Sequence, residues 1–158
     1  MKKLNLTKSK SAMVDSKMHT VLSNWKWSLH SMGYACRNRK GKLILLHRQI
    51  MDFPKLNVDH INGDKLDNRT INLRLCTQAE NTRNSKSHKD STSKYKGVFW
   101  NKDTRKWRTR LMFNGKTVLD KCFVSETDAA DEYNAQAKIY HGKFAKFNNL
   151  TENIASPI

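Results

Sequence analysis

Short stretches of alternating hydrophobic and polar residues occur in two separate regions of the chain. In the first region, residues 56–60 alternate and lead into Asn62-Gly63, a dipeptide typical of turns. Residues 71–75 then alternate again. Thr77 and Glu80 form a T-x-x-E capping box, which predicts that a helix begins there. The region therefore predicts the order strand, loop, strand, helix.

The sequence before this region carries weaker signals. Residues 1–25 start with a stretch rich in Lys, Ser and Thr, and we expect that stretch to fray. The apolar run Leu43–Leu46 is compatible with a buried strand or with the start of a helix, because periodicity does not separate the two over so short a run. Pro54 ends whichever element forms.

The second region, residues 95–148, predicts three strands and a helix. One strand is apolar on one face and mostly basic on the other, with Trp107, Thr109, Leu111 and Phe113 opposed to Lys106, Arg108, Arg110 and Met112. Asn114-Gly115 is a favoured hairpin turn, and residues 117–123 return as the partner strand. Between the two regions, residues 85–94 form a basic linker, suited to following a phosphate backbone or to serving as a solvated tether.

The helix of the second region is expected to cover one face of its sheet. Ser125 suits the N-cap, and Gly142 stands where the helix should end. An apolar stripe lies between them, at Ala130, Tyr133, Ala137 and Tyr140. We expect this stripe to pack on the Trp107 face, leaving the arginine face exposed. The fold class is therefore α+β, and residues 149–158 form a tail.

The charge of the chain indicates a polyanionic partner. The 158 residues include 30 Lys and Arg against 14 Asp and Glu, a formal net charge of +16, and only 37% are hydrophobic. Such an excess is the electrostatic signature of nucleic-acid binding. The charge is uneven, since residues 94–121 hold nine basic and two acidic residues, whereas residues 122–158 hold three and five. We expect the basic segment to face double-stranded DNA.

The three cysteines, Cys36, Cys76 and Cys122, include no C-x-x-C pair, so neither a structural zinc site nor a disulfide framework is expected. Free thiols are typical of a reducing compartment, and we expect a cytoplasmic protein. The chain has no signal-peptide core and no apolar run near the ~20 residues of a membrane span, so no membrane partner is expected. No heptad indicates a protein partner, which favours a monomer.

Candidate chemistry lies in the strand–loop–strand–helix region. A histidine such as His60 activates water when its pKa lies near neutrality. Mg²⁺ prefers oxygen ligands, and the carboxylate of Asp59 and the amide of Asn81 supply them. Because neighbouring residues of a strand point to opposite faces, base and metal would stand on opposite sides of one phosphate. The pattern predicts hydrolysis of a phosphodiester.

Residues 12–84 resemble HNH endonucleases, most closely the homing endonucleases of phages and their introns. The resemblance is carried by Val58-Asp59-His60-Ile61-Asn62-Gly63-Asp64, Asp67-Asn68-Arg69, Asn72-Leu73-Arg74 and Glu80-Asn81. It implies a ββα-metal nuclease module, which we assign to residues 1–84. In that module His60 is the general base, Asp59 and Asn81 hold the metal, and Asn72 fixes the loop and the orientation of His60.

The resemblance also bears on the cofactor and the products. The third motif residue is Asn81 instead of a histidine, which in this branch implies Mg²⁺ or Mn²⁺. Cleavage would leave 5′-phosphate and 3′-hydroxyl ends, and one site per chain would nick one strand. A phage-encoded enzyme would act in the cytoplasm of its host. His47 reads either as a buried hydrogen-bonded histidine or as a phosphate contact, and Arg48 and Arg74 as DNA contacts or as salt-bridge partners.

Residues 94–148 resemble a DNA-binding domain of the APETALA2/ethylene-response-factor type. The resemblance is carried by Tyr95-Lys96-Gly97-Val98, Trp107-Arg108, Phe123, Ala129-Ala130 and residues 141–148. It implies a three-stranded antiparallel sheet in the major groove, backed by one helix, with Lys96 at a DNA-contacting position. Phe99 and Met112 occupy positions where plant members have arginines, so the plant target sequence does not transfer. The strand alternation adds Arg108 and Arg110 as DNA contacts.

Two other interpretations remain open. The chain could be a non-catalytic, sequence-specific DNA-binding protein that uses the C-terminal sheet. The weaker one is a protein that binds or cleaves RNA, which the positive charge alone would also suit.

Overall fold

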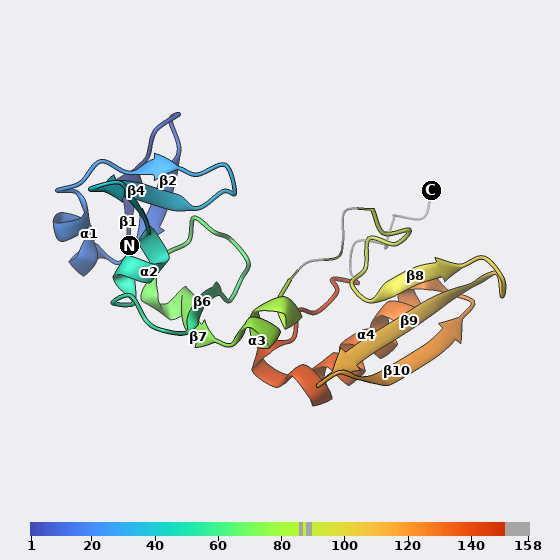
Figure 1. The fold of residues 1–158 in the computed structure, drawn as a ribbon. Coiled ribbons are helices and arrows are strands. Elements are labelled where there is room, and N and C mark those ends of the chain that lie inside the picture. Colours follow the sequence, from blue (N-terminus) through green and yellow to red (C-terminus); the bar gives the residue numbers. More distant parts are fainter. Residues whose placement is uncertain (86, 88–89, 151–158) are drawn as a thin grey trace. The chain divides into compact units, whose positions relative to one another are not determined.

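The computed structural model describes residues 1–85, 87 and 90–150, and the chain divides into two compact units, residues 1–81 and 82–158. Figure 1 shows the elements of each unit. Three residues of the predicted linker and residues 151–158 of the predicted tail lie outside the described residues. None of the helices in the described part of the chain has the length and apolar character that crossing a membrane requires.

The N-terminal 25 residues form regular structure, so the expectation that their first stretch frays is wrong. They contain an antiparallel hairpin and a helix, β1 (Lys2–Asn5), β2 (Ser11–Val14) and α1 (Ser16–Leu22). The apolar residues that alternate along both strands are buried in one core, with Leu4, Leu6, Ala12, Val14, Leu22, Trp27, Ala35 and Leu46. The polar composition of this segment masked the alternation that anchors it.

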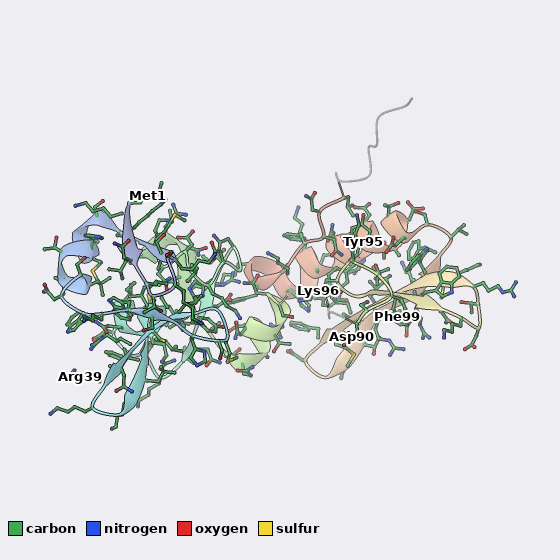
Figure 2. All side chains as sticks on the ribbon, turned by 90° about the horizontal axis from the view of Figure 1, so that it is seen from above. Met1, Arg39, Asp90, Tyr95, Lys96 and Phe99 are labelled. Carbon is green, nitrogen blue, oxygen red and sulfur yellow. The ribbon has the colours of Figure 1, made fainter. Side chains whose placement is uncertain are left out.

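A second antiparallel sheet follows, with strand order β3-β4-β5. Its strands and the next helix are β3 (Ser28–Leu29), β4 (Ala35–Arg39), β5 (Lys42–Leu45) and α2 (Leu46–Ile50). The apolar run at residues 43–46 thus ends a strand and begins a helix, and α2 ends before Pro54. Arg39 lies at the tip of the β4–β5 hairpin (Figure 2).

The predicted order strand, loop, strand, helix is present at the end of this unit. The elements are β6 (Asn57–His60), the 3₁₀ helix η1 (Thr70–Asn72), β7 (Leu73–Cys76) and α3 (Gln78–Arg83). The predicted capping box is confirmed, because the Thr77 N–H donates to Glu80 at 2.8 Å and the Glu80 N–H donates to the Thr77 hydroxyl at 3.3 Å. The second strand begins later than expected, since Ile71 belongs to η1 and is exposed.

The second unit is a three-stranded antiparallel sheet, ordered β10-β9-β8, with α4 against one face (Figure 1). Its elements are β8 (Val98–Asn101), β9 (Lys106–Phe113), β10 (Lys116–Phe123), α4 (Glu126–His141) and the 3₁₀ helix η2 (Gly142–Phe144). The Ser125 hydroxyl accepts from the Asp128 N–H at 3.3 Å, as an N-cap should. Mixed α and β structure with small antiparallel sheets is therefore confirmed for the described residues.

The two faces of β9 differ as the alternation predicts. Thr109 and Leu111 are buried against α4, whereas Arg110 and Met112 are exposed. The predicted stripe of α4 is buried at Ala130, Tyr133 and Ala137, with Tyr140 packed beside them. Asn114 and Gly115 both take positive φ, 49° and 77°, which the favoured two-residue hairpin turn requires.

Gly97 is a position that only glycine fits. Its φ is +74°, and an added Cβ would lie 2.2 Å from Cε2 of Tyr133. We predict that Gly97→Ala destabilises the C-terminal unit by about 3 kcal/mol, from overpacking plus left-handed strain. Urea unfolding measures this loss. Gly115→Ala is the matched control, because φ is +77° there but nothing lies within 4 Å, so it should cost about 1 kcal/mol. Equal losses in both variants would remove Tyr133 from the explanation.

Candidate functional site

β6 carries two adjacent, buried, polar side chains at its end. Asp59 is 7% exposed and His60 is 5% exposed. The pairing with β7 sets Asp59 opposite Arg74 and His60 opposite Leu73. Because successive strand residues point to opposite faces, the carboxylate and the imidazole have different neighbours.

The carboxylate of Asp59 is bound by the guanidinium across the ladder. Nε and Nη2 of Arg74 both donate to Oδ2 of Asp59, at 2.9 and 2.7 Å. Both side chains are largely buried, with 8% of Asp59 and 13% of Arg74 exposed. A buried carboxylate is costly unless a cation compensates it, so this contact keeps the strand pair stable. Arg74 was expected to be either a DNA contact or a salt-bridge partner, and the described structure contains the salt bridge.

The imidazole of His60 is held by a loop asparagine. Its Nε2 lies 3.3 Å from Oδ1 of Asn68, and Nδ2 of Asn68 donates to the Lys65 carbonyl at 3.3 Å, which fixes the amide orientation. With Oδ1 as acceptor the proton is on Nε2, and Nδ1 carries the lone pair that a base needs. Burial lowers the pKa of His60, while the Asn68 bond and the nearby carboxylates oppose the shift. The imidazole is therefore neutral at neutral pH.

Sequence reasoning did not single out Asn68, although it lies in a stretch that carries the family resemblance. The side chain is 1% exposed despite its position in a loop. No periodicity marks such a residue, because its burial depends on contacts made by the folded loop.

The loop between β6 and β7 is held together by carboxamides. Oδ1 of Asn72 accepts from the Asn62 N–H at 3.0 Å, and its Nδ2 donates to Oδ1 of Asn62 at 3.0 Å and to the Asp67 carbonyl at 2.8 Å. Asp67 is buried, and Arg69 donates two bonds to its carboxylate. Asn72 therefore holds the loop that contains Asn68. Its contribution to catalysis stays a prediction.

A second histidine and a tyrosine lie against His60. The ring centroids of His47 and His60 are 5.1 Å apart, and the Tyr34 ring lies 5.1 Å from His47 and 6.1 Å from His60. The prediction that His47 is buried is confirmed, but the predicted hydrogen bond is not found: Nδ1 of His47 is buried without a partner among the described residues. Burial, followed by the charges of His60 and Arg48, lowers the pKa of His47 to about 4.

Asn81 lies in α3, half-buried, and its N–H donates to the Thr77 carbonyl at 3.0 Å. In the described part of the chain, no three His, Cys, Asp or Glu side chains gather into a metal-binding group. A metal here would therefore depend on Asp59, on an amide oxygen such as that of Asn81, and on water or substrate. These are hard oxygen donors, which suit Mg²⁺ and Mn²⁺. Arg48 bonds the carbonyls of Pro54 and Leu56, a contact within this unit.

The candidate DNA contacts of the second unit fall into two groups. Arg108 and Arg110 lie on the sheet face away from α4 and share the carboxylate of Asp120, whose pKa they lower to about 2. Lys96 lies apart from them. Its ammonium donates to the carbonyls of Thr82, Arg83 and Ser85, at the end of α3, and burial with the charge of Lys146 lowers its pKa to about 8.

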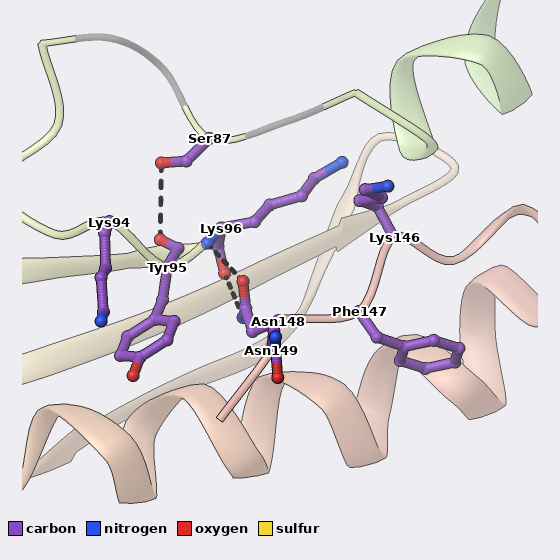
Figure 3. A pocket seen from close by; sticks show the side chains of 8 residues that line it. All are labelled: Ser87, Lys94, Tyr95, Lys96, Lys146, Phe147, Asn148 and Asn149. Atoms are coloured by element: carbon purple, nitrogen blue, oxygen red, sulfur yellow. Dashed lines mark hydrogen bonds between the residues drawn. The ribbon is translucent and has the colours of Figure 1, made fainter. Parts of the chain in front are cut away.

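Lys96 also takes part in the closure of this unit. Its N–H donates to Oδ1 of Asn148 at 2.7 Å, and Nδ2 of Asn148 donates back to the Lys96 carbonyl at 3.1 Å. The pair lies at a hollow of about 260 Å³, lined by Ser87, Lys94, Tyr95, Lys96, Lys146, Phe147, Asn148 and Asn149 (Figure 3). Through these hydrogen bonds Lys96 joins the chain before β8 to the segment after α4. Its contact with DNA stays a prediction.

A family model and a named relative both indicate the HNH endonuclease family. A family model described as HNH endonuclease matches residues 52–83. A protein of Acanthamoeba polyphaga mimivirus named Uncharacterized HNH endonuclease L560 is 33% identical over 137 residues, covering 82% of this chain and 70% of the relative. Protein 3.8 of Escherichia phage T7 is 34% identical over 90 residues, 57% of this chain and 74% of that protein. No solved structure matches the chain. The family model does not reach residues 94–148, so the APETALA2-type resemblance has no support from it.

The shifted pKa of His47 predicts a pH-dependent stability. The folded state keeps His47 neutral down to a pKa of about 4, whereas the unfolded chain binds a proton near 6.5. Between these values the unfolded state binds more protons, so stability is lost as pH falls through this window. We expect the wild type to lose about 2 to 3 kcal/mol more than His47→Gln between pH 7 and pH 4.5, measured by urea unfolding at each pH. Parallel losses would show that His47 is not the titrating group.

Proposed function

The chain belongs to the HNH endonuclease family, and on that premise we propose that it is a metal-dependent DNA endonuclease of the homing type that nicks one strand. The observation that carries the proposal is the adjacent pair on β6. Asp59 is buried against a cation, and His60 is buried with one nitrogen held by Asn68. Buried titratable groups with specific partners are typical of reacting sites.

His60 acts as the general base in this proposal. Its lowered pKa keeps the imidazole unprotonated at neutral pH, and Asn68 directs the proton to Nε2. Nδ1 then accepts a proton from water, which attacks phosphorus while the 3′ oxygen departs. The products carry 5′-phosphate and 3′-hydroxyl ends. His47 is neutral as well, so it contributes a hydrogen bond to the phosphate and no charge.

Asp59 and Asn81 would hold the metal ion, Mg²⁺ or Mn²⁺. When bound, the ion stabilises charge on the phosphate and on the departing 3′ oxygen as a Lewis acid. Two observations support this assignment. Asp59 keeps a cation within 2.7 Å even though it is buried, and Asn81 supplies an oxygen donor from α3, the element that follows β7.

The nuclease unit carries its own basic surface for DNA. Residues 1–48 contain eleven Lys and Arg and one acidic residue, Asp15. The ratio of basic to acidic residues is therefore higher there than in residues 94–121. Three of these eleven, Arg39, Lys40 and Lys42, lie at the tip of the β4–β5 hairpin and are exposed. Counterion release from DNA favours such a surface. This unit therefore would bind the substrate that it cuts.

We propose that the C-terminal unit adds affinity and some specificity through its open sheet face. Support comes from the fold, a three-stranded antiparallel sheet with one helix behind it, as the APETALA2-type resemblance implies. Arg108 and Arg110 project from that face, within reach of phosphate or bases. Asp120 binds both guanidinium groups and would have to release them to DNA.

The nuclease proposal predicts metal-dependent nicking that requires His60. Supercoiled plasmid should become relaxed circles with Mg²⁺ and stay supercoiled with EDTA. His60→Ala should cut at least about 100-fold more slowly, since a general base contributes 10²- to 10⁴-fold. His19→Ala is the matched control, because His19 lies in α1 of the same unit and its imidazole bonds the Lys3 carbonyl and Ser23 instead of site residues.

The same variants separate catalysis from folding. His60→Ala should bind DNA as wild type does in a gel-shift assay. If it cuts plasmid at the rate of wild type, His60 is not the base, and a nick that survives in EDTA removes the metal.

The sheet proposal predicts a change in salt dependence. Arg108→Gln with Arg110→Gln should weaken DNA binding and reduce the slope of log K against log salt by about one to two, the share of two phosphate contacts. Asp120→Asn should act in the opposite direction, because it frees both guanidinium groups. Fluorescence anisotropy over a salt series measures both. Unchanged slopes in all variants would exclude this face from DNA binding.

A further inference from the structure

We propose that Arg74 is the resident counter-cation of Asp59 and opposes the binding of a divalent metal to that carboxylate, so that Arg74 weakens the metal affinity of the site. The inference rests on the proposed metal site and goes beyond it, because it assigns a role to a residue outside the ligand set. Arg74 is a positioning residue here, acting on metal through Asp59.

Nε and Nη2 of Arg74 donate to the same carboxylate oxygen, Oδ2 of Asp59, at 2.9 and 2.7 Å. The two residues face each other in the β6–β7 ladder, so the backbone itself holds the guanidinium beside the carboxylate. Arg74 is therefore not a surface side chain that happens to fold over the site.

A metal bound to Asp59 would sit about 2.1 Å from a carboxylate oxygen, and thus within a few ångströms of a guanidinium that already bonds the same carboxylate. Two cations at that separation repel strongly. The repulsion is stronger here than in water, because only 8% of the Asp59 side chain and 13% of the Arg74 side chain are exposed. Metal binding must therefore break the Arg74 contact or act against the repulsion, and either event lowers the affinity.

Arg74 also has a stabilising role in the protein without metal. Without metal, removal of Arg74 would leave the buried Asp59 carboxylate uncompensated, which strongly destabilises a fold. Arg74 thus stabilises the metal-free protein at the expense of metal affinity. Metal-free stability and metal affinity should consequently change in opposite directions when Arg74 is replaced.

The test measures Mn²⁺ binding without DNA, from the electron paramagnetic resonance signal of free Mn²⁺. Arg74→Gln should lower the Mn²⁺ dissociation constant about tenfold, equivalent to about 1.4 kcal/mol. Arg74→Lys keeps a positive charge but loses the two-pronged contact, so it should lower the constant by a smaller factor, about threefold. Arg69→Gln is the matched control, because it removes an ion pair of the same loop, between the partly exposed Arg69 and the buried Asp67, and should leave the constant unchanged.

Thermal unfolding with and without Mn²⁺ gives a second readout. Arg74→Gln should melt below wild type without metal and gain more from Mn²⁺ than wild type does. If Arg74→Gln does not fold without metal, Arg74→Lys carries the comparison.

The outcomes separate this inference from the proposed function. Equal or weaker Mn²⁺ binding by both Arg74 variants, with binding lost in Asp59→Asn, overturns the inference and keeps the metal site. Such a result would mean that Arg74 orients Asp59 for the ion. Wild type that binds no Mn²⁺, or Asp59→Asn that binds it as tightly as wild type, overturns the proposed metal site itself.

Discussion

A buried carboxylate that must always have a cation beside it is the constraint on which the site depends. Asp59 lies near the end of β6, paired with Arg74 of β7, and is 7% exposed. Leaving such a charge unpaired costs several kcal/mol, so the strand pair is stable only with Arg74, or in our proposal a metal ion, in contact with Asp59. The position of this one charge links the stability of the strand pair to the chemistry of the site.

The loop between β6 and β7 solves a related problem for His60. A base must be held in one tautomer and orientation, yet it sits at the end of a strand where the chain turns. Asn72 ties the two ends of the loop together, and the loop in turn presents Asn68 to the imidazole. The catalytic geometry proposed for His60 thus rests on carboxamide hydrogen bonds, which do not titrate and so keep their strength across the working pH range.

Local chemistry made much of the fold predictable. The capping box at Thr77 and the N-cap Ser125 are confirmed because each depends on atoms within three residues. The alternation of β9 likewise predicted which face meets α4. The hairpin of residues 2–14 was missed because its apolar positions are few and lie among lysines and serines, so only the packed core identifies them. For this hairpin the composition suggested fraying, whereas the alternation of its few apolar residues indicated the strands.

The site was less predictable than the fold, for a physical reason. The identities of Asp59 and His60 follow from the motif, but their partners Arg74 and Asn68 are fixed by ladder register and loop closure. Lys96 illustrates the same limit, because residue type predicted a DNA contact while the folded unit uses its ammonium at the end of α3. Contacts between residues far apart in sequence decide which charged group meets which.

In the proposed nuclease, Asp59 and Asn81 form one metal site beside His60. Anomalous scattering from crystals soaked in Mn²⁺ tests it most directly, because it locates the ion without reference to activity. We expect a single strong peak that lies about 2.1 to 2.4 Å from an oxygen of Asp59 and from the amide oxygen of Asn81. A peak bound by other residues, or none near β6 at an Mn²⁺ concentration that supports cleavage, would contradict it.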